Sequence, residues 1–343
     1  MTHRTINGSA DGGHRLVATR RGRSVLPPPS LAPAAARGFR RRFRRQVTSL
    51  HKMWASHLAV AKRIDSGNGR LNSEILPMLR GTNAGDTNAA QVALGGFNQL
   101  GPSVYHAMDS LMAMSILVTK PLPGPYMVAA RSSFEAAQRV IWALEPVADL
   151  RERVCRLAAV ELENEREARR ALARYSPKEA KPFAQALEER AAKTDALLAS
   201  AQIDVERSRR HIVIRDGERS VQVPINVTGL AEKWRGLDSS GFYARLSGYT
   251  HGLTWALRGG PSPDAASLSM ADAAATGLVV AGACQEAVSL FDLWIGIPDG
   301  MVMKRFVKVI ESCAEASRTL REAGGRSGVS GPEAGRAQPH HQR

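Results

Sequence analysis

The residues best suited to chemistry lie in one stretch, 241–252, which reads GFYARLSGYTHG. Tyr243, Ser247 and His251 recur every fourth residue, and on a helix this spacing places them on one polar and aromatic face. An imidazole beside a hydroxyl can take up or release a proton near neutral pH, as a general base or acid must. The pattern therefore predicts a helix with His251 as a candidate catalytic residue. A core histidine bonded to Ser247 is the alternative that stays open.

A second candidate face lies earlier in the chain, where Arg131, Glu135 and Arg139 follow one another at intervals of four residues. The rest of this segment is largely apolar, and charges on a buried helix must be paired or belong to a site. One interpretation is an Arg–Glu–Arg series along one helix, with little effect on stability. The other is an anion-binding face on which Glu135 holds both guanidinium groups in place.

Other common kinds of site are not indicated by the sequence. The three cysteines, Cys155, Cys284 and Cys313, are far apart and form no C-x-x-C pair, which favours a reducing compartment and argues against structural zinc. No glycine-rich phosphate loop of the usual spacing occurs. We therefore expect neither a metal nor another cofactor, and a cytoplasmic location.

The elements that must position these candidates are helices. Ala, Leu, Arg and Glu are abundant and aromatic residues make up 5% of the chain, a composition that favours helix over strand. Ser176-Pro-Lys-Glu179 combines an N-cap serine, a proline in the first turn and a capping-box glutamate, so it predicts a helix start at Pro177. Apolar spacing predicts helices from about 40 and at about 105–118, 126–144, 147–174, 177–199, 227–235, 240–257, 263–295 and 300–323.

Strand character is confined to 211–223, where two Val- and Ile-rich runs flank Asp216-Gly217, a signal for a type I′ hairpin turn. The sequence thus predicts an all-α bundle with a small β-hairpin insertion, and a helical hairpin at about 147–200. The boundaries that we expect are a disordered Arg- and Pro-rich arm (1–39), a helical domain (40–323) and a disordered tail (324–343). The apolar stretch 273–297 contains Gln285, Glu286 and Asp292, so it predicts a core helix and no membrane span.

The net charge of +15 is concentrated at the N-terminus. Eleven arginines and one aspartate precede Gln46, which gives +10, and five arginines and three glutamates after Cys313 give +2, leaving about +3 for the middle. We therefore expect the basic character to belong to an arm and not to the fold. Such an arm could bind RNA or an acidic membrane, or it could serve only solubility. On the long helix after 147, Glu161, Glu163, Glu165 and Glu167 are expected to form a solvated face paired with arginines.

The two candidate segments together carry a family resemblance. Arg131-Ser-Ser-Phe-Glu135 and the later Tyr243-Ala-Arg-Leu-Ser-Gly-Tyr-Thr-His251 resemble an uncharacterised bacterial family that pairs two such helices. That pattern in turn resembles the HEPN superfamily of helical ribonucleases, toxins and abortive-infection proteins. Its signature is an Arg followed, after four to six residues, by a His, as in Arg245 and His251. The resemblance covers roughly 100–260.

This resemblance implies metal-independent RNA cleavage in stress or phage defence, at a site shared by a homodimer. His251 would be the general base or acid, and Arg245 would stabilise charge on the phosphate. The residues implied to bind or support the substrate are Arg131, Glu135, Arg139, Tyr243, Ser247 and Tyr249. Two alternatives stay open: a non-catalytic helical interaction protein, and a bundle that binds a small carboxylate or phosphate through Arg131 and Arg139.

Overall fold

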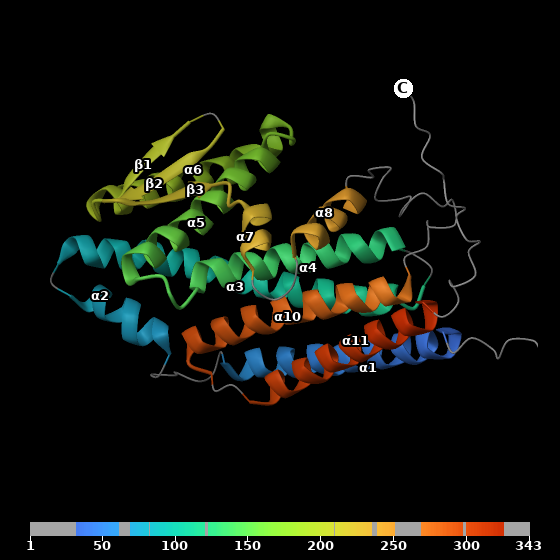
Figure 1. Cartoon of the computed structure of the whole chain (residues 1–343). Helices are drawn as coiled ribbons and strands as arrows, with labels where there is room; N and C mark the ends of the chain where they lie inside the picture. The colour runs from blue at the N-terminus through green and yellow to red at the C-terminus, as the bar shows by residue number, and fades with distance from the viewer. Residues whose placement is uncertain are drawn as a thin grey trace, which may run out of the picture.

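The protein is a long helical bundle with a small antiparallel sheet on one side (Figure 1). The computed structural model describes residues 32–61, 69–81, 83–120, 123–208, 210–234, 239–250, 269–297 and 300–325. Within these ranges the predicted all-α architecture is confirmed.

The helices, in chain order, are α1 (Ala32–Ala61), the π-helical turn η1 (Leu71–Ile75), α2 (Leu76–Arg80), α3 (Ala84–Leu117), α4 (Pro123–Leu144), α5 (Leu150–Leu172), α6 (Pro177–Ser200), α7 (Val227–Lys233), α8 (Ser239–Thr250), α10 (Met270–Ile295) and α11 (Met301–Gly325). The strands β1 (Asp204–Arg207), β2 (Ile212–Asp216) and β3 (Arg219–Val223) lie between α6 and α7.

The core is centred on α10, which packs against α3, α4 and α11. Phe97 of α3 stacks on Trp294 and Phe291 of α10, with ring centres 5.6 and 5.3 Å apart. Among the described residues, α10 is the one helix with the length and hydropathy of a membrane span, and 56% of its most apolar window is buried. Core helices pass the same test, so this property alone is weak evidence for a membrane.

Helix α3 is longer than the sequence suggested. The apolar spacing predicts a helix only from about residue 105, yet one helix runs from Ala84 through Pro102 to Leu117. Buried residues recur along its first half at helical spacing, and this half packs against α5 and α6. Tertiary burial therefore stabilises a segment whose Gly and Asn content obscured the helical period.

The hairpin of α5 and α6 agrees with prediction, and the Ser176 capping box is present, with both the side-chain and the backbone bond formed. The β2–β3 hairpin is also found, but two details differ. A third strand, β1, pairs with β2. The turn residues are Gly217 and Glu218, and only Gly217 has positive φ. Type I′ needs positive φ at both positions, so that prediction is wrong.

Helix α1 begins at Ala32, earlier than the expected start near Arg40. Its buried face is formed by Phe39, Phe43, Val47, Leu50 and Trp54, which pack against α3 and α11. The six arginines at 37, 40, 41, 42, 44 and 45 therefore belong to a packed helix. The expectation that the basic charge belongs only to an arm is wrong for these six. The predicted arm before residue 32 and the predicted tail after 325 lie outside the described residues.

Candidate functional site

Helix α8 lies across α4 and brings three predicted site residues together. The Nε of Arg131 donates to Oε1 of Glu135 over 2.5 Å, and the hydroxyl of Tyr243 donates to the same oxygen over 2.7 Å. The guanidinium carbon of Arg131 also lies 5.7 Å from the centre of the Tyr243 ring. The spacing of Arg131 and Glu135 within one helix explains their pair, whereas the contact with Tyr243 joins segments 108 residues apart.

Aromatic packing holds α8 in this position. Phe134 meets the rings of Phe242 and Trp234 edge-on, each with centres 5.6 Å apart. Leu246, one turn after Phe242, is fully buried. Because these contacts lie beside Tyr243, they fix where its hydroxyl meets Glu135.

The environment keeps the tyrosine neutral and the arginine charged. Burial raises the pKa of Tyr243, and its hydrogen bond to Glu135 raises that pKa further, because the carboxylate favours the protonated phenol. Burial alone would lower the pKa of Arg131, but the hydrogen bond and charge of Glu135, with a smaller contribution from Tyr243, outweigh it and raise that pKa. The group is thus an ion pair with an attached hydrogen-bond donor.

Arg139 does not join this group. Its Nε lies 3.5 Å from Oε2 of Glu163 on α5, while the other oxygen of Glu163 accepts the backbone N–H of Ile225 over 3.1 Å. The prediction that Glu135 holds both arginines is therefore wrong: it holds Arg131, and Glu163 holds Arg139. Burial raises the pKa of Glu163, against the opposing effect of Arg139.

The expected solvated row of glutamates on α5 is wrong for its first two members. Glu161 and Glu163 are only 6% and 7% exposed. Glu161 accepts two hydrogen bonds from Arg190 of α6, at 2.6 and 2.8 Å. This part of α5 is covered by helix α6 and by the segment that joins β3 to α7. Periodicity along one helix could not show this cover.

A cleft of about 690 Å³ opens next to these residues. Glu135, Tyr243 and Trp142 line it from α8 and α4, and Arg156 and Glu152 line it from α5. The remaining wall comes from β3, α7 and the segment that joins them: Ser220, Val221, Gln222, Pro224, Ile225, Asn226, Val227, Thr228, Gly229, Leu230 and Lys233. The volume is that of a pocket for a small molecule.

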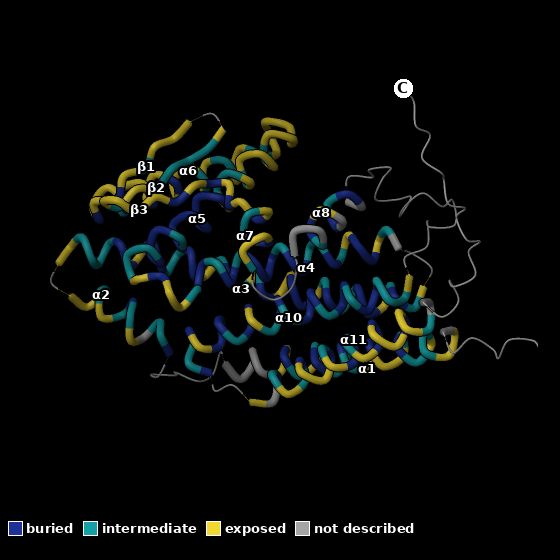
Figure 2. Tube along the Cα trace, viewed as in Figure 1, coloured by how far each residue is buried: buried dark blue, intermediate teal, exposed yellow. Residues whose placement is uncertain are grey.

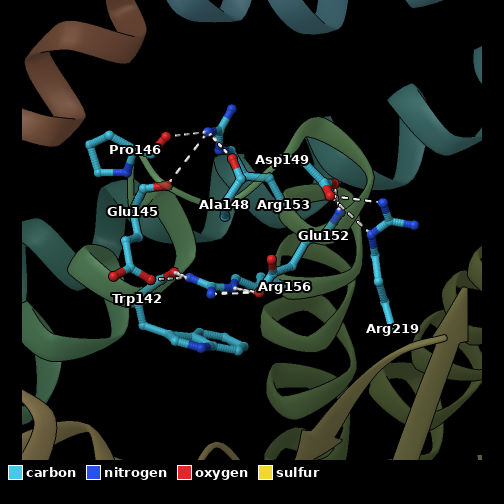
Figure 3. Close-up of polar contacts among 9 residues, drawn as sticks. All are labelled: Trp142, Glu145, Pro146, Ala148, Asp149, Glu152, Arg153, Arg156 and Arg219. Atoms are coloured by element: carbon cyan, nitrogen blue, oxygen red, sulfur yellow. Dashed lines mark hydrogen bonds and ion pairs between the residues drawn. The ribbon is translucent and has the colours of Figure 1, made fainter.

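The charges at the α5 side of this cleft are largely neutralised (Figure 3). The guanidinium group of Arg156 donates to the carboxylates of Glu145 and Glu152 over 2.8 and 2.6 Å, and to the carbonyl oxygen of Trp142 over 2.6 Å. It also lies over the Trp142 ring, 5.6 Å from its centre. Lys233, by contrast, has no ion-pair partner within the part of the chain that the structure describes.

A separate groove of about 590 Å³ runs along the exposed side of α1. Five arginines line it together with Thr48 and Thr119: Arg37, Arg40, Arg41, Arg44 and Arg45. Arg40 donates to the Met270 sulfur, and none of the five has a carboxylate partner among the described residues. Arg42 points elsewhere and pairs with Glu315 of α11 over 3.2 Å.

Sequence reasoning missed this groove, although a signal was present. Arg40, Arg41, Arg44 and Arg45 follow Arg37 by three, four, seven and eight residues, a spacing that places all five on one face of a helix. The expected helix start near Arg40 leaves Arg37 in the arm, and the net charge alone does not show that the other four share a face with it.

The predicted catalytic pair is outside what the structure describes. The backbone of Arg245 and Tyr249 lies in α8, but their side chains are not described, and His251 lies beyond the last described residue of α8. Ser247 is partly buried on the same helix, one turn after Tyr243. The pairing of Arg245 with His251 therefore stays a prediction.

Among the described residues, no group of three or more His, Cys, Asp and Glu side chains could hold a metal ion. The three cysteines are buried and unpaired by disulfides, and burial raises the pKa of Cys155 and Cys284 to about 12. Comparison with known proteins finds no matching family model, no matching curated protein and no matching solved structure. The resemblance to HEPN proteins accordingly stays a prediction.

Proposed function

We propose that this protein binds single-stranded RNA along the arginine groove of α1. The single observation that carries this proposal is the groove itself, where five arginines converge and none of the described lining residues is acidic. Guanidinium groups bind phosphate oxygens through paired, charge-assisted hydrogen bonds. A surface that gathers five of them on a rigid helix offers a track for a phosphate backbone.

Cleavage of the bound RNA is the second part of the proposal. The Arg131–Glu135–Tyr243 group would support a site on α8 at which His251 and Arg245 act without a metal, as the resemblance to HEPN proteins implies. In this proposal Glu135 anchors Tyr243 and thereby α8, and its contact at 2.7 Å is the structural basis for that role. A cytoplasmic role in stress or phage defence rests on the resemblance alone.

Binding can be tested by fluorescence anisotropy with a labelled, mixed-sequence, single-stranded RNA. Five phosphate contacts would give a slope of about −3.5 for the logarithm of the association constant against that of the salt concentration. Replacing Arg41 and Arg44 with glutamine should weaken binding and make the slope shallower by about 1.4, at about 0.7 for each contact.

Arg42→Gln is the matched control, because it removes an arginine of the same helix that pairs with Glu315 outside the groove. It should change RNA affinity much less than the double variant does. Equal affinity of the double variant and the wild type would refute the groove as the RNA site. Binding to vesicles with anionic lipid, but not to RNA, would point to a membrane surface instead.

Cleavage is tested separately, by incubating the RNA with purified protein in EDTA. The proposal expects cleavage by the wild type and none by His251→Ala. RNA binding without cleavage would retain the first part of the proposal and reject the second.

The cleft beside Glu135 favours a second candidate function, the binding of a small anionic or zwitterionic molecule. The observations behind it are the volume of about 690 Å³ and the exposed Lys233, which pairs with no carboxylate among the described residues. Nucleoside monophosphates and dicarboxylates are suitable probes in thermal-shift measurements. A stabilisation of the wild type that is lost in Lys233→Gln would support this function.

A further inference from the structure

The tip of the α5–α6 hairpin carries an apolar groove of about 630 Å³. Leu172 and Tyr175 line it from the end of α5, and Phe183 and Leu187 line it from α6, with the small residues Ala168, Ala171 and Ala186 between them. Tyr175 and Phe183 are 62% and 67% exposed, which is unusual for side chains of this size. The exposed colour of this hairpin is evident in Figure 2.

No other part of the described chain covers this groove. The buried residues of α6 are Ala191, Thr194 and Leu198, all in its C-terminal half. The first half of α6 therefore has no buried residue, and in Figure 1 the turn between the two helices stands clear of the bundle. Two helices alone leave an apolar face in water, whereas four helices can enclose it.

The groove face of α6 has a pattern that fits a copy of itself. Glu179, Phe183, Ala186 and Arg190 lie on one side of the helix at intervals of four, three and four residues. This order is symmetric about its midpoint. When a second α6 is laid antiparallel across the first, Glu179 faces Arg190 and the large Phe183 faces the small Ala186.

We propose that a second copy of this chain covers the groove, with the two α6 helices antiparallel about a two-fold axis. Each dimer would contain two pairs of Glu179 with Arg190 of the partner, and two Phe183 rings seated against Ala186 of the partner. Arg190 already binds Glu161, but 52% of its side chain remains exposed and can face a second carboxylate. The two hairpins would form a four-helix bundle. This inference stands on the hairpin surface and is independent of RNA binding.

The mass of the full chain in solution tests the proposal, measured by light scattering across a concentration series. The wild type should approach the mass of a dimer as concentration rises, and Phe183→Asp should stay monomeric at every concentration. Val147→Asp is the control, since it places the same charge on a side chain that is 85% exposed and lies outside the groove. A monomeric wild type, or a dimer that Phe183→Asp leaves intact, would overturn the proposal.

The antiparallel arrangement is tested by crosslinking, which reads out geometry rather than stability. Ala186→Cys adds a thiol in the groove, and Gln185→Cys adds an exposed one outside the groove, about 100° further round the same helix. All three native cysteines are buried, so only the new thiol should react in the folded protein. A short bis-maleimide should join two Ala186→Cys chains and leave Gln185→Cys chains mostly unjoined. Efficient joining of Gln185→Cys alone would refute the proposed packing.

Discussion

Helices α3 and α5 approach each other so closely at Gly96 that a single methyl group added at this position should destabilise the fold. A Cβ atom added there would lie 3.0 Å from the Cα of Leu157 and closer still to its carbonyl group. The obstruction is backbone, which cannot turn away as a side chain can. Gly96→Ala is therefore expected to push α5 away from α3. Since α5 carries Arg156 and Glu152, the shift would also reach the cleft.

Two opposing effects set the magnitude. Alanine in place of glycine within a helix stabilises by about 1 kcal/mol. Overpacking a dense contact costs about 1–3 kcal/mol, and more where backbone must move. Gly96→Ala should thus destabilise by up to about 2 kcal/mol, after the two effects are added. Gly95→Ala has only the first effect, because nothing lies within 4 Å of a Cβ atom at that position.

Urea unfolding followed by circular dichroism would compare the two variants with the wild type. Because Gly95 and Gly96 are neighbours in one helix, the difference between them removes the effect of helix propensity and isolates the contact with α5. We expect a gap of about 1–3 kcal/mol, or roughly 1–5 °C in melting temperature. Gly96→Ala as stable as Gly95→Ala would refute the close approach of the two backbones.

Three further predictions follow from buried polar groups. Arg153→Met should destabilise by about 1–3 kcal/mol in urea unfolding, because Arg153 is 3% exposed and its loss leaves the buried Ala148 carbonyl, at 2.6 Å, without its donor. Among the described residues, Glu74 would keep only its 3.7 Å ion pair with Arg70, and an equally stable variant would contradict the prediction. The buried cysteine thiols, two with pKa values raised to about 12, should resist a thiol reagent at pH 8 and react after unfolding, so rapid reaction of the native protein would count against their burial. The raised pKa of Glu163 means that its ionisation opposes folding, so this group lowers stability as the pH rises above about 4.5, its ordinary value, through its folded pKa. The unfolding midpoint of Glu163→Gln should therefore fall less with rising pH than that of the wild type. Parallel pH profiles of the two proteins would show that Glu163 does not contribute to the pH dependence of stability.

Local signals predicted the elements well wherever one short stretch contains all the needed information. Ser176-Pro-Lys-Glu179 marks the start of α6 correctly, because a capping box joins groups only three residues apart. The β2–β3 hairpin was found for the same reason. Helix α3 was only partly recognised, since much of its stability comes from burial against α5 and α6, which is not a local property.

The candidate site divides in the same way. Spacing alone related Arg131 to Glu135, as partners within one helix. It could not choose between Glu135 and Glu163 as the partner of Arg139, because Glu163 lies on another helix. The contact between Tyr243 and Glu135 likewise depends on how α8 packs against Phe134.

The sequence by itself determined the helical class, the caps, the hairpins and the faces on which charged residues lie, because each depends on neighbours within about one or two turns. Tertiary structure alone decided which charges are buried, which carboxylate each arginine binds, and that the arginines of α1 line a groove. The physical reason is that burial and pairing depend on groups from distant segments. One chain pattern is compatible with several such arrangements, and only packing selects among them.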